Sequence, residues 1–386
     1  MWGVSVIVVQ LKLVPSPEQA AALAATLRAV NTQANHVSRV AFTTGTRRNF
    51  ALRKRVYADV RVAGIGSQAA QHVIKKVADA YTALAANLRN GNHGRPGSQR
   101  RRAVESKPVV FRPDAAQPYD ARNLSFALDA RTVSLWSLGG RLKGVPFTCS
   151  PEQLKVPAEH RRGEADLVVR DGMWFLLVGV TVPDAPAYEP DGFLGVDLGI
   201  ANIATASDGR IMAGRRLNRY RRRQARLRQK LQAKGTTSAE RLLKRQRRKE
   251  SRRGRDANHV TSKRIVAEAE RTGRGISLED LTGIRARVRQ RKPQRATLHS
   301  WAFAQLGTFI SYKAKRAGVP VVFVEAAYSS RECADCHYTH HRNRISQARF
   351  VCRSCGVVAH ADRNASRVLA RRGQEAWNAG RPSGDP

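Results

Sequence analysis

The sequence predicts a multidomain α+β protein: an N-terminal β-barrel with a helical lobe inserted into it, then an α/β domain that carries a zinc ribbon. Three observations lead to this prediction. The order of strand and helix signals changes near residue 190, two C-x-x-C pairs lie near the C-terminus, and the 386 residues carry a net charge of +39. A chain of this length can build two or three separate cores.

The N-terminal half begins with one apolar strand over residues 3–14, which is followed by helical patterns from Pro17 and over 67–90. Residues 91–108 are rich in Gly, Pro, Ser and Arg, which predicts a flexible boundary loop. A basic connector without a predicted helix separates the first two helical patterns.

Short strands then follow one another up to Pro183, and Asp171-Gly172 indicates a two-residue hairpin turn between two of them. A lone strand, then helices, then a β-meander predicts that the helices are inserted into a small barrel. The expected domains are the barrel over 1–14 and 105–188 and the helical lobe over 15–104.

Beyond residue 193 the chain predicts three strands, two basic helices, a strand, a helix, a strand, a cysteine-rich insertion and a last helix. With the insertion set aside, this is the element order of the RNase H fold. Thr237 and Glu240 are expected to form a capping box at the start of the second basic helix. Asp362 begins the last helix and Gly373 is a stop signal for it. The expected ranges are 193–326 and 357–373 for this domain, 327–356 for the ribbon and 374–386 for a flexible tail.

Four of the five cysteines form the two C-x-x-C pairs, with fifteen residues between the pairs. Two such knuckles can complete a tetrahedral four-sulfur zinc site, and four protein ligands leave no open position for a substrate, so the zinc is predicted to be structural. Disulfide bonds are the alternative, disfavoured in a basic, cysteine-poor chain without a secretion signal. The predicted ligands are Cys333, Cys336, Cys352 and Cys355.

Three acids occupy unusual places in the predicted α/β domain: Asp197 lies within an apolar strand, Glu279 ends another strand, and Asp362 begins the last helix. A buried carboxylate without a partner is costly, and a bound cation relieves that cost. If the three converge, they can hold two Mg²⁺ ions for hydrolysis of a phosphodiester. The alternatives are three unrelated structural acids, with Asp362 a helix cap. Asn364 is expected to support Asp362 by hydrogen bonding.

The excess of positive charge is concentrated between Arg215 and Arg255, a segment that contains nineteen Lys or Arg and two Glu. A surplus of this size calls for a polyanionic partner, and nucleic acid is the simplest one. A solvated helix face is the alternative for the helices, and a membrane surface is the alternative partner. The predicted nucleic-acid contacts are Arg215, Arg216, Arg219, Arg222, Arg223, Arg226, Lys244, Arg245 and Arg248.

A series of motifs follows the order GVDLGI, ISLEDL with TGIR, LHSWAFAQL, YKAKRAGVPVVFV, the C-x-x-C pairs and HADRNAS. Together these motifs resemble TnpB, the accessory nuclease of bacterial insertion sequences, and the related compact type V CRISPR effectors. The resemblance implies a wedge-like barrel with a helical recognition lobe, followed by a RuvC-like nuclease domain whose inserted zinc ribbon, residues 327–356, binds the target nucleic acid. By motif, the three acids and the four cysteines carry over as catalytic and zinc residues. His337 departs from the family pattern, which has Gly after the second cysteine.

The resemblance further implies a guide RNA, recognition of a short motif beside a double-stranded DNA target, and cleavage of that target. Shape and charge hold a guide–target heteroduplex while base pairing reads sequence, so a basic channel fits this role. The candidate motif-reading residues are Gln68, Gln71, Lys75 and Lys76.

The three acids and the resemblance together imply a Mg²⁺-dependent endodeoxyribonuclease, and the resemblance alone implies that an RNA guides it. The alternatives are a guide-free RuvC-type nuclease or transposase, and an RNA-guided DNA-binding regulator that does not cleave. The chain has no run of about 18 apolar residues and no secretion leader, so we expect a cytoplasmic or nucleoid-associated protein, prokaryotic by resemblance.

Overall fold

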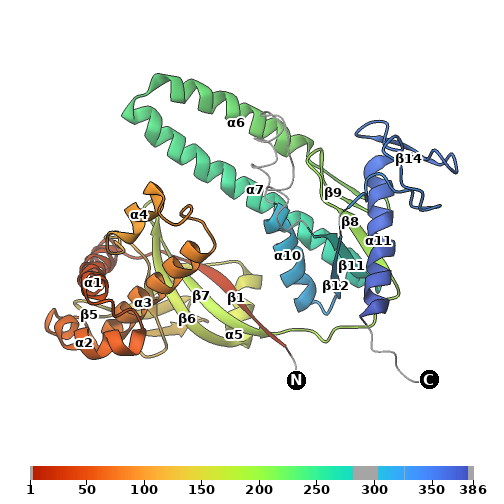
Figure 1. The fold of residues 1–386 in the computed structure, drawn as a ribbon. Coiled ribbons are helices and arrows are strands. Elements are labelled where there is room, and N and C mark those ends of the chain that lie inside the picture. Colours follow the sequence, from red (N-terminus) through yellow and green to blue (C-terminus); the bar gives the residue numbers. More distant parts are fainter. Residues whose placement is uncertain (1–2, 281–302, 326, 381–386) are drawn as a thin grey trace. The chain divides into compact units, whose positions relative to one another are not determined.

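The computed structural model describes residues 3–280, 303–325 and 327–380. The chain divides into two compact units, Val6–Val182 and Met1–Ser5 with Pro183–Pro386 (Figure 1). The fold is of the mixed α+β class that the sequence predicts. No helix in the described ranges combines the length and the apolar character that crossing a membrane requires.

The first unit is built on a seven-stranded sheet in the order β2-β6-β7-β1-β5-β4-β3. Asp171 and Gly172 both have positive φ and connect β6 to β7, which confirms the predicted hairpin. One apolar core lies against this sheet and includes Leu11, Leu135 and Leu176, all fully buried. The strands are β1 (Val4–Leu13), β2 (Gln117–Tyr119), β3 (Leu124–Ala127), β4 (Thr132–Ser137), β5 (Gly140–Thr148), β6 (Arg161–Arg170) and β7 (Met173–Pro183).

A second apolar core of this unit is formed mainly by helices, among them Val30 of α1, Leu52 of α2 and Ile74 of α3. The division into a barrel and a helical lobe stays a prediction, although the two cores follow it. The helices are α1 (Pro17–Thr44), α2 (Asn49–Val62), α3 (Ser67–Arg89), α4 (Gln99–Glu105) and α5 (Pro151–Glu159).

Three of these helices differ from the sequence prediction. The basic connector folds as α2, because Leu52, Val56 and Val60 recur at helical spacing and are buried among its charges. Residues 91–108, predicted as a flexible loop, contain α4, whose N-cap Ser98 accepts a hydrogen bond from the backbone of Arg101. Helix α5 was not predicted, although its sequence contains a capping box.

The second unit holds a five-stranded sheet in the order β10-β9-β8-β11-β12. The first three strands along the chain are antiparallel neighbours, whereas β8, β11 and β12 run parallel. This order confirms the predicted arrangement of strands in the α/β domain. The strands are β8 (Phe193–Asp197), β9 (Asn202–Ala206), β10 (Ile211–Ala213), β11 (Gly275–Glu279) and β12 (Val321–Val324).

Two long helices, α6 (Arg215–Lys234) and α7 (Thr237–Arg271), form a hairpin that projects from this sheet, and α10 (Phe303–Arg316) packs beside α7 (Figure 1). The prediction made Thr237 the cap of the second helix, with Glu240 in a capping box. This was wrong by one residue, because the side chain of Thr236 accepts the capping hydrogen bond from Ala239. The TGIR segment and most of the LHSWAFAQL segment lie outside the described residues.

The last helix, α11 (Ala361–Ala379), crosses β8 and β11 at two glycines. A Cβ on Gly195 of β8 would lie 2.0 Å from the carbonyl oxygen of Ser366, and a Cβ on Gly373 would lie 2.5 Å from the Cβ of Ser277. The prediction of Gly373 as a stop signal was wrong. Gly373 is buried within the helix and permits close packing on β11, so residues 374–379 are helical and do not belong to a flexible tail.

Candidate nuclease site and zinc ribbon

Asp197 and Glu279 lie side by side at the ends of two parallel strands. In the register of β8 and β11, Leu278 pairs with Val196, so the two acids follow at the same end of the sheet. Both strands are buried up to this point, and each acid is the first partly exposed residue of its strand. The apolar strands therefore carry both carboxylates to one edge of the sheet, as the sequence analysis expected.

Asp362 reaches this edge from the first turn of α11. Its buried carboxylate accepts hydrogen bonds from Asn202 Nδ2 at 3.1 Å and from Arg344 Nη2 at 3.0 Å. The Asn202 amide comes from the first residue of β9, and Arg344 comes from the cysteine-rich segment before α11. Three separate segments thus position one acid.

The three carboxylates act on one another electrostatically. Burial, and after it the charges of Glu279 and Asp362, raise the pKa of Asp197 to about 8, while the charge of Arg344 acts in the opposite direction. Burial also raises the pKa of Glu279, against a hydrogen bond from Ser329 and the charges of Arg372 and Arg344. Two carboxyl groups whose pKa values are raised mainly by burial mark this edge of the sheet as a candidate functional site.

The expectation about Asn364 was wrong, and two residues that contact Asp362 were not predicted. Asn364 does not bond to Asp362; its side chain accepts from the backbone of Ala334 and donates to the backbone of Glu332, so it holds the ribbon to α11. Sequence reasoning missed Arg344 and Asn202, because one arginine among 69 basic residues carries no distinguishing signal.

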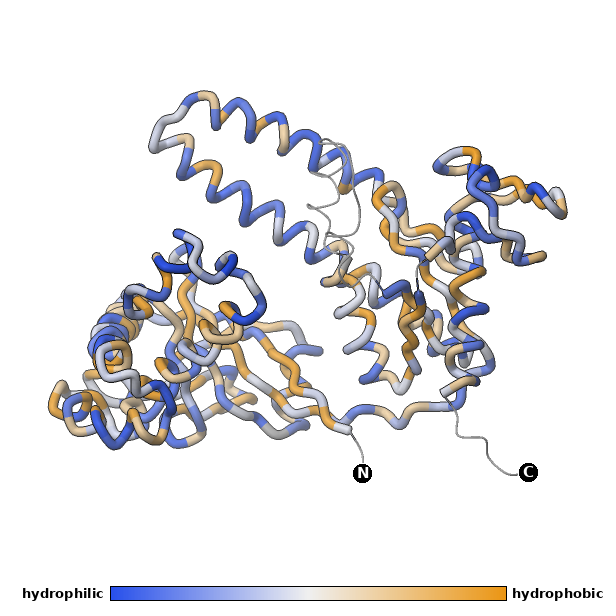
Figure 2. Tube along the Cα trace, in the orientation of Figure 1, coloured by the Kyte–Doolittle hydropathy of each residue, from blue (hydrophilic) through white to orange (hydrophobic). Residues whose placement is uncertain are grey.

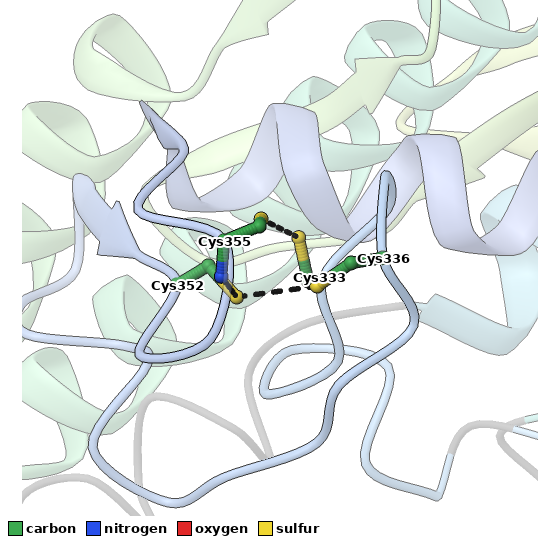
Figure 3. Close-up of side chains that lie close together, drawn as sticks. All are labelled: Cys333, Cys336, Cys352 and Cys355. Atoms are coloured by element: carbon green, nitrogen blue, oxygen red, sulfur yellow. Dashed lines mark hydrogen bonds between the residues drawn. The ribbon is translucent and has the colours of Figure 1, made fainter.

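The four cysteines gather in one cluster, with ligand atoms that all lie within 4.8 Å of one another (Figure 3). The Sγ atoms of Cys333 and Cys355 are 3.7 Å apart, and those of Cys336 and Cys352 are 3.4 Å apart. These separations exceed an S–S bond of about 2.05 Å, so the disulfide alternative fails and the cysteines are free. Among the described residues this is the one group of three or more His, Cys, Asp or Glu so tightly gathered, and the three acids are spaced more widely.

The cluster fits a tetrahedral metal of the zinc type. Each pair closes a knuckle, and in the second knuckle the backbone amides of Ser354 and Cys355 donate to Cys352 Sγ at 3.4 and 3.5 Å. Such N–H···S bonds stabilise a thiolate, which is the form that binds metal. The strands β13 (Arg349–Val351) and β14 (Val358–His360) complete a small hairpin around the second knuckle.

The ribbon is fastened to α11 by several polar contacts. Glu332, next to the first cysteine, is buried and paired with Arg371 and Arg372 of that helix. Asp335, between the two cysteines of the first pair, pairs with Arg367. The ribbon and the helix that carries Asp362 therefore form one connected structure.

The helix hairpin of α6 and α7 is hydrophilic along most of its length (Figure 2). Its apolar contacts are few, with Leu217 and Leu231 the buried positions of α6. All nine predicted nucleic-acid contacts are exposed, namely Arg215, Arg216, Arg219, Arg222, Arg223, Arg226, Lys244, Arg245 and Arg248. Their placement is compatible with a phosphate backbone, and their role stays a prediction.

The four candidate motif-reading residues lie on α3, half-buried. Gln68 donates to Asp120 at 2.6 Å, and Lys75 pairs with Glu164 at 2.7 Å. Burial lowers the pKa of Lys76 to about 8, and its amine donates to Asn31. Three of the four thus have partners inside the protein, and base reading by Gln68, Gln71, Lys75 and Lys76 stays a prediction.

Comparison with known proteins adds to this geometry. Residues 176–282 match the OrfB_IS605 family model, described as a probable transposase, and residues 303–369 match the Cas12f1-like TNB domain. The chain is related to the TnpB-like and Cas12f proteins. The two matched segments contain all three acids and all four cysteines of the TnpB/Cas12f-related chain.

Individual TnpB and Cas12f relatives align over parts of the chain. A CRISPR-associated endodeoxyribonuclease Cas12f1 from Sulfoacidibacillus thermotolerans is 41% identical over 29% of this chain and 26% of its own length. A TnpB-like protein from Methanocaldococcus jannaschii is 28% identical over 51% of this chain and 75% of its own length. The matches span less than half the length of the Cas12f1 relatives.

A solved structure of a Cas12f1–sgRNA–target DNA complex has a similar fold. Its protein aligns with a TM-score of 0.60 at 12% identity, over 90% of this chain and 82% of that chain. At this identity the likeness is one of fold.

Proposed function

We propose that this TnpB/Cas12f-related chain is an RNA-guided DNA endonuclease that hydrolyses phosphodiester bonds at Asp197, Glu279 and Asp362. The observation that supports the proposal is that β8 and β11 bring Asp197 and Glu279 to one edge of the sheet, where the charges of Glu279 and Asp362 both raise the pKa of Asp197. Relatives named endodeoxyribonucleases support the reaction class, and a fold shared with a guide RNA and target DNA complex supports the partners.

The donor set at the sheet edge fits hard divalent cations. Oxygen ligands suit Mg²⁺, and a site that raises the pKa of its own carboxyl groups gains stability from added positive charge. Asp197, Glu279 and Asp362 would hold two Mg²⁺ ions, which would supply an activated water and charge stabilisation at the leaving oxygen. Zn²⁺ in the four-cysteine ribbon has a structural role, because all four ligands come from the protein.

The chain's own residues orient these acids. Asn202 and Arg344 fix both oxygens of Asp362, and Ser329 fixes Oε1 of Glu279. The exposed arginines of α6 and α7 supply a cationic surface for the nucleic-acid backbone, which is the sequence-independent part of binding. The guide RNA supplies sequence recognition by base pairing with the target.

The decisive experiment compares purified wild-type protein with Asp197→Asn, the matched isosteric variant, on double-stranded DNA complementary to the RNA that copurifies. We expect wild-type cleavage that needs Mg²⁺ and is abolished by RNase treatment before assembly. We expect Asp197→Asn to bind the target without cutting it. Cleavage that survives RNase would indicate a guide-free nuclease, and wild-type binding without cleavage would indicate a regulator.

A further inference from the structure

The side chain of Arg372, on α11, holds the segment that runs from the end of β12 to the first zinc-ligand cysteine. Its Nη1 donates to the backbone carbonyl oxygens of Glu325 at 2.6 Å and Ala327 at 3.0 Å. Its Nη2 lies 2.5 Å from the carboxylate of Glu332. We call Glu325 and residues 327–332 the linking segment. One guanidinium therefore holds this segment near both of its ends.

Between these two ends the linking segment reaches the candidate nuclease site. Ser329 is 4% exposed, and its hydroxyl donates to Oε1 of Glu279 at 2.9 Å. The strands β11 and β12 run parallel, with Val324 paired to Glu279, so the linking segment leaves the sheet at the edge where this acid lies. The hydroxyl of Ser329 thus joins the linking segment directly to a carboxylate of the site.

The backbone of the linking segment turns tightly at Tyr328. This residue has φ of 60°, in the left-handed region that is costly for a residue with a side chain and persists only where the surroundings hold it. The backbone amides of Arg331 and Glu332 donate to its carbonyl oxygen at 2.8 and 3.0 Å. Ser329 follows directly, so its position depends on the contacts that hold this turn, three of which come from Arg372.

The packing of α11 fixes the place from which Arg372 acts. The next residue is Gly373, where a Cβ would lie 2.5 Å from the Cβ of Ser277 in β11, the strand that ends at Glu279. The side chain of Arg372 is 21% exposed. A planar guanidinium binds several oxygens at once in a fixed geometry, which the single amine of a lysine cannot do.

We infer that Arg372 is a positioning residue for Glu279, and that it acts through the linking segment and Ser329. The inference rests on the metal site of the proposed nuclease, in which Glu279 would hold Mg²⁺. Without Arg372 the linking segment would shift, and the hydroxyl of Ser329 would no longer fix Oε1 of the acid. The alternative is a purely structural role, in which Arg372 only joins α11 to the ribbon through Glu332, as Arg371 does.

Two effects of Arg372 on a bound cation have opposite signs. Its positive charge repels a divalent cation, so loss of the charge alone would tighten metal binding. Its contacts orient a metal ligand, and loss of such contacts typically weakens metal binding about 10- to 100-fold. The direction of the change therefore distinguishes positioning from charge.

The test measures Mn²⁺ binding to the full-length, zinc-loaded protein in the absence of nucleic acid, by electron paramagnetic resonance of the free ion. Mn²⁺ prefers the same oxygen ligands as Mg²⁺. Glu279→Gln gives the background from other sites, and the difference from wild type is the affinity that depends on Glu279. Arg372→Gln and Arg372→Lys should both weaken this affinity about tenfold or more, since neither side chain can replace the guanidinium.

Arg371→Gln is the matched control. Arg371 pairs with Glu332 and with Glu375, but it makes none of the contacts to the carbonyl oxygens of Glu325 and Ala327. This variant loses an equal charge and one link between α11 and the ribbon. Its Mn²⁺ affinity should equal that of the wild type. Zinc content near one ion per chain establishes that each variant keeps its ribbon.

A double-mutant cycle tests the path through Ser329. Ser329→Ala alone should weaken Mn²⁺ binding about tenfold, because it removes the hydrogen bond to Glu279. Combining it with Arg372→Gln should weaken binding no further, since two residues that act along one path are not additive. Ser329→Ala removes a single hydroxyl group, so it tests the path even where the Arg372 variants lose zinc.

The outcomes are distinct for the two proposals. Three results overturn the positioning role even where guided cleavage is intact: unchanged or tighter Mn²⁺ binding in zinc-loaded Arg372→Gln, wild-type affinity in Arg372→Lys, or additive losses in the double variant. Absence of guided cleavage by the wild type, with Mn²⁺ affinity that falls in both Arg372 variants and in Ser329→Ala, overturns the nuclease and leaves the positioning role standing.

Discussion

Arg344 Nη2 lies 3.0 Å from Oδ1 of Asp362, so a ribbon residue is paired directly with a carboxylate of the candidate nuclease site. The same guanidinium opposes the upward pKa shifts of Asp197 and Glu279. One arginine outside the sheet thus affects all three acids. This pairing gives the first of five predictions.

Replacing Arg344 by alanine should lower the cleavage rate about 10- to 100-fold, the usual effect of removing a group that orients a metal ligand. Loss of its charge should also raise the pKa values of Asp197 and Glu279, so the pH–rate profile should move to higher pH. Single-turnover cleavage from pH 6 to 9 measures both effects. Arg349→Ala, at an exposed arginine of β13, is the control; an unmoved profile for Arg344→Ala would contradict the assignment.

Asp197 should make the Mg²⁺-free protein less stable as pH rises. Its folded pKa of about 8 exceeds its ordinary value of 3.8, so the folded state binds the proton more tightly. Unfolding then becomes easier as pH rises from about 4 to about 8. Asp197→Asn should remove this part of the dependence and raise the thermal midpoint near pH 8. Equal pH slopes for the two proteins in magnesium-free buffer would disprove the shift.

Removing one zinc ligand should unfold the ribbon and disturb the acids as well. Cys352→Ser should release the zinc and lower thermal stability, because metal binding contributes directly to the folding of such small modules. Guided cleavage should fall with zinc content, since Arg344 comes from the ribbon. Cys149→Ser, which alters the one cysteine outside the cluster, should retain zinc and activity. Metal analysis of the purified proteins distinguishes the two variants.

Neutralising part of α6 should weaken nucleic-acid binding in a salt-dependent way. Each lost phosphate contact should reduce the slope of log K against log salt by about 1. The variant replaces Arg222, Arg223 and Arg226 by glutamine, and titrations at several salt concentrations measure the slope. Replacing three exposed lysines of the other unit, Lys12, Lys143 and Lys155, removes the same charge. A similar loss of slope in this control would mean that binding follows net charge alone.

Gly195→Ala should destabilise the second unit strongly. The new Cβ would lie 2.0 Å from the carbonyl oxygen of Ser366 and 2.4 Å from the backbone nitrogen of Ala370. Overpacking of this kind typically costs about 1–3 kcal/mol. Gly254→Ala on α7 is the matched control, because its nearest contact is a flexible Arg221 atom at 3.8 Å and alanine favours helix. Urea unfolding should place the two variants on opposite sides of wild type.

The strand order of the second unit followed from the sequence, because its buried strands are short apolar runs with clear turns between them. The same signal placed Asp197 and Glu279, since an acid that ends an apolar run lies at the edge of a sheet. The cysteine spacing predicted the four-sulfur cluster for a similarly local reason. Each of these features depends on residues that are close together in sequence.

Features that depend on contacts between residues far apart in the sequence were not predicted. Gly373 has the composition of a helix stop, and only the approach of β11 shows that it is a packing position inside α11. Asn364 was expected to serve Asp362, two residues away, but its partners come from the ribbon 30 and 32 residues earlier. In both cases the deciding neighbour belongs to another element.

The contacts of Glu332 and Asn364 have a consequence for the position of Asp362. They join the cysteine ribbon to α11, the helix that carries Asp362, and Arg344 of the ribbon pairs with that acid. The position of Asp362 therefore depends on the folding of the cysteine ribbon as well as on its own helix.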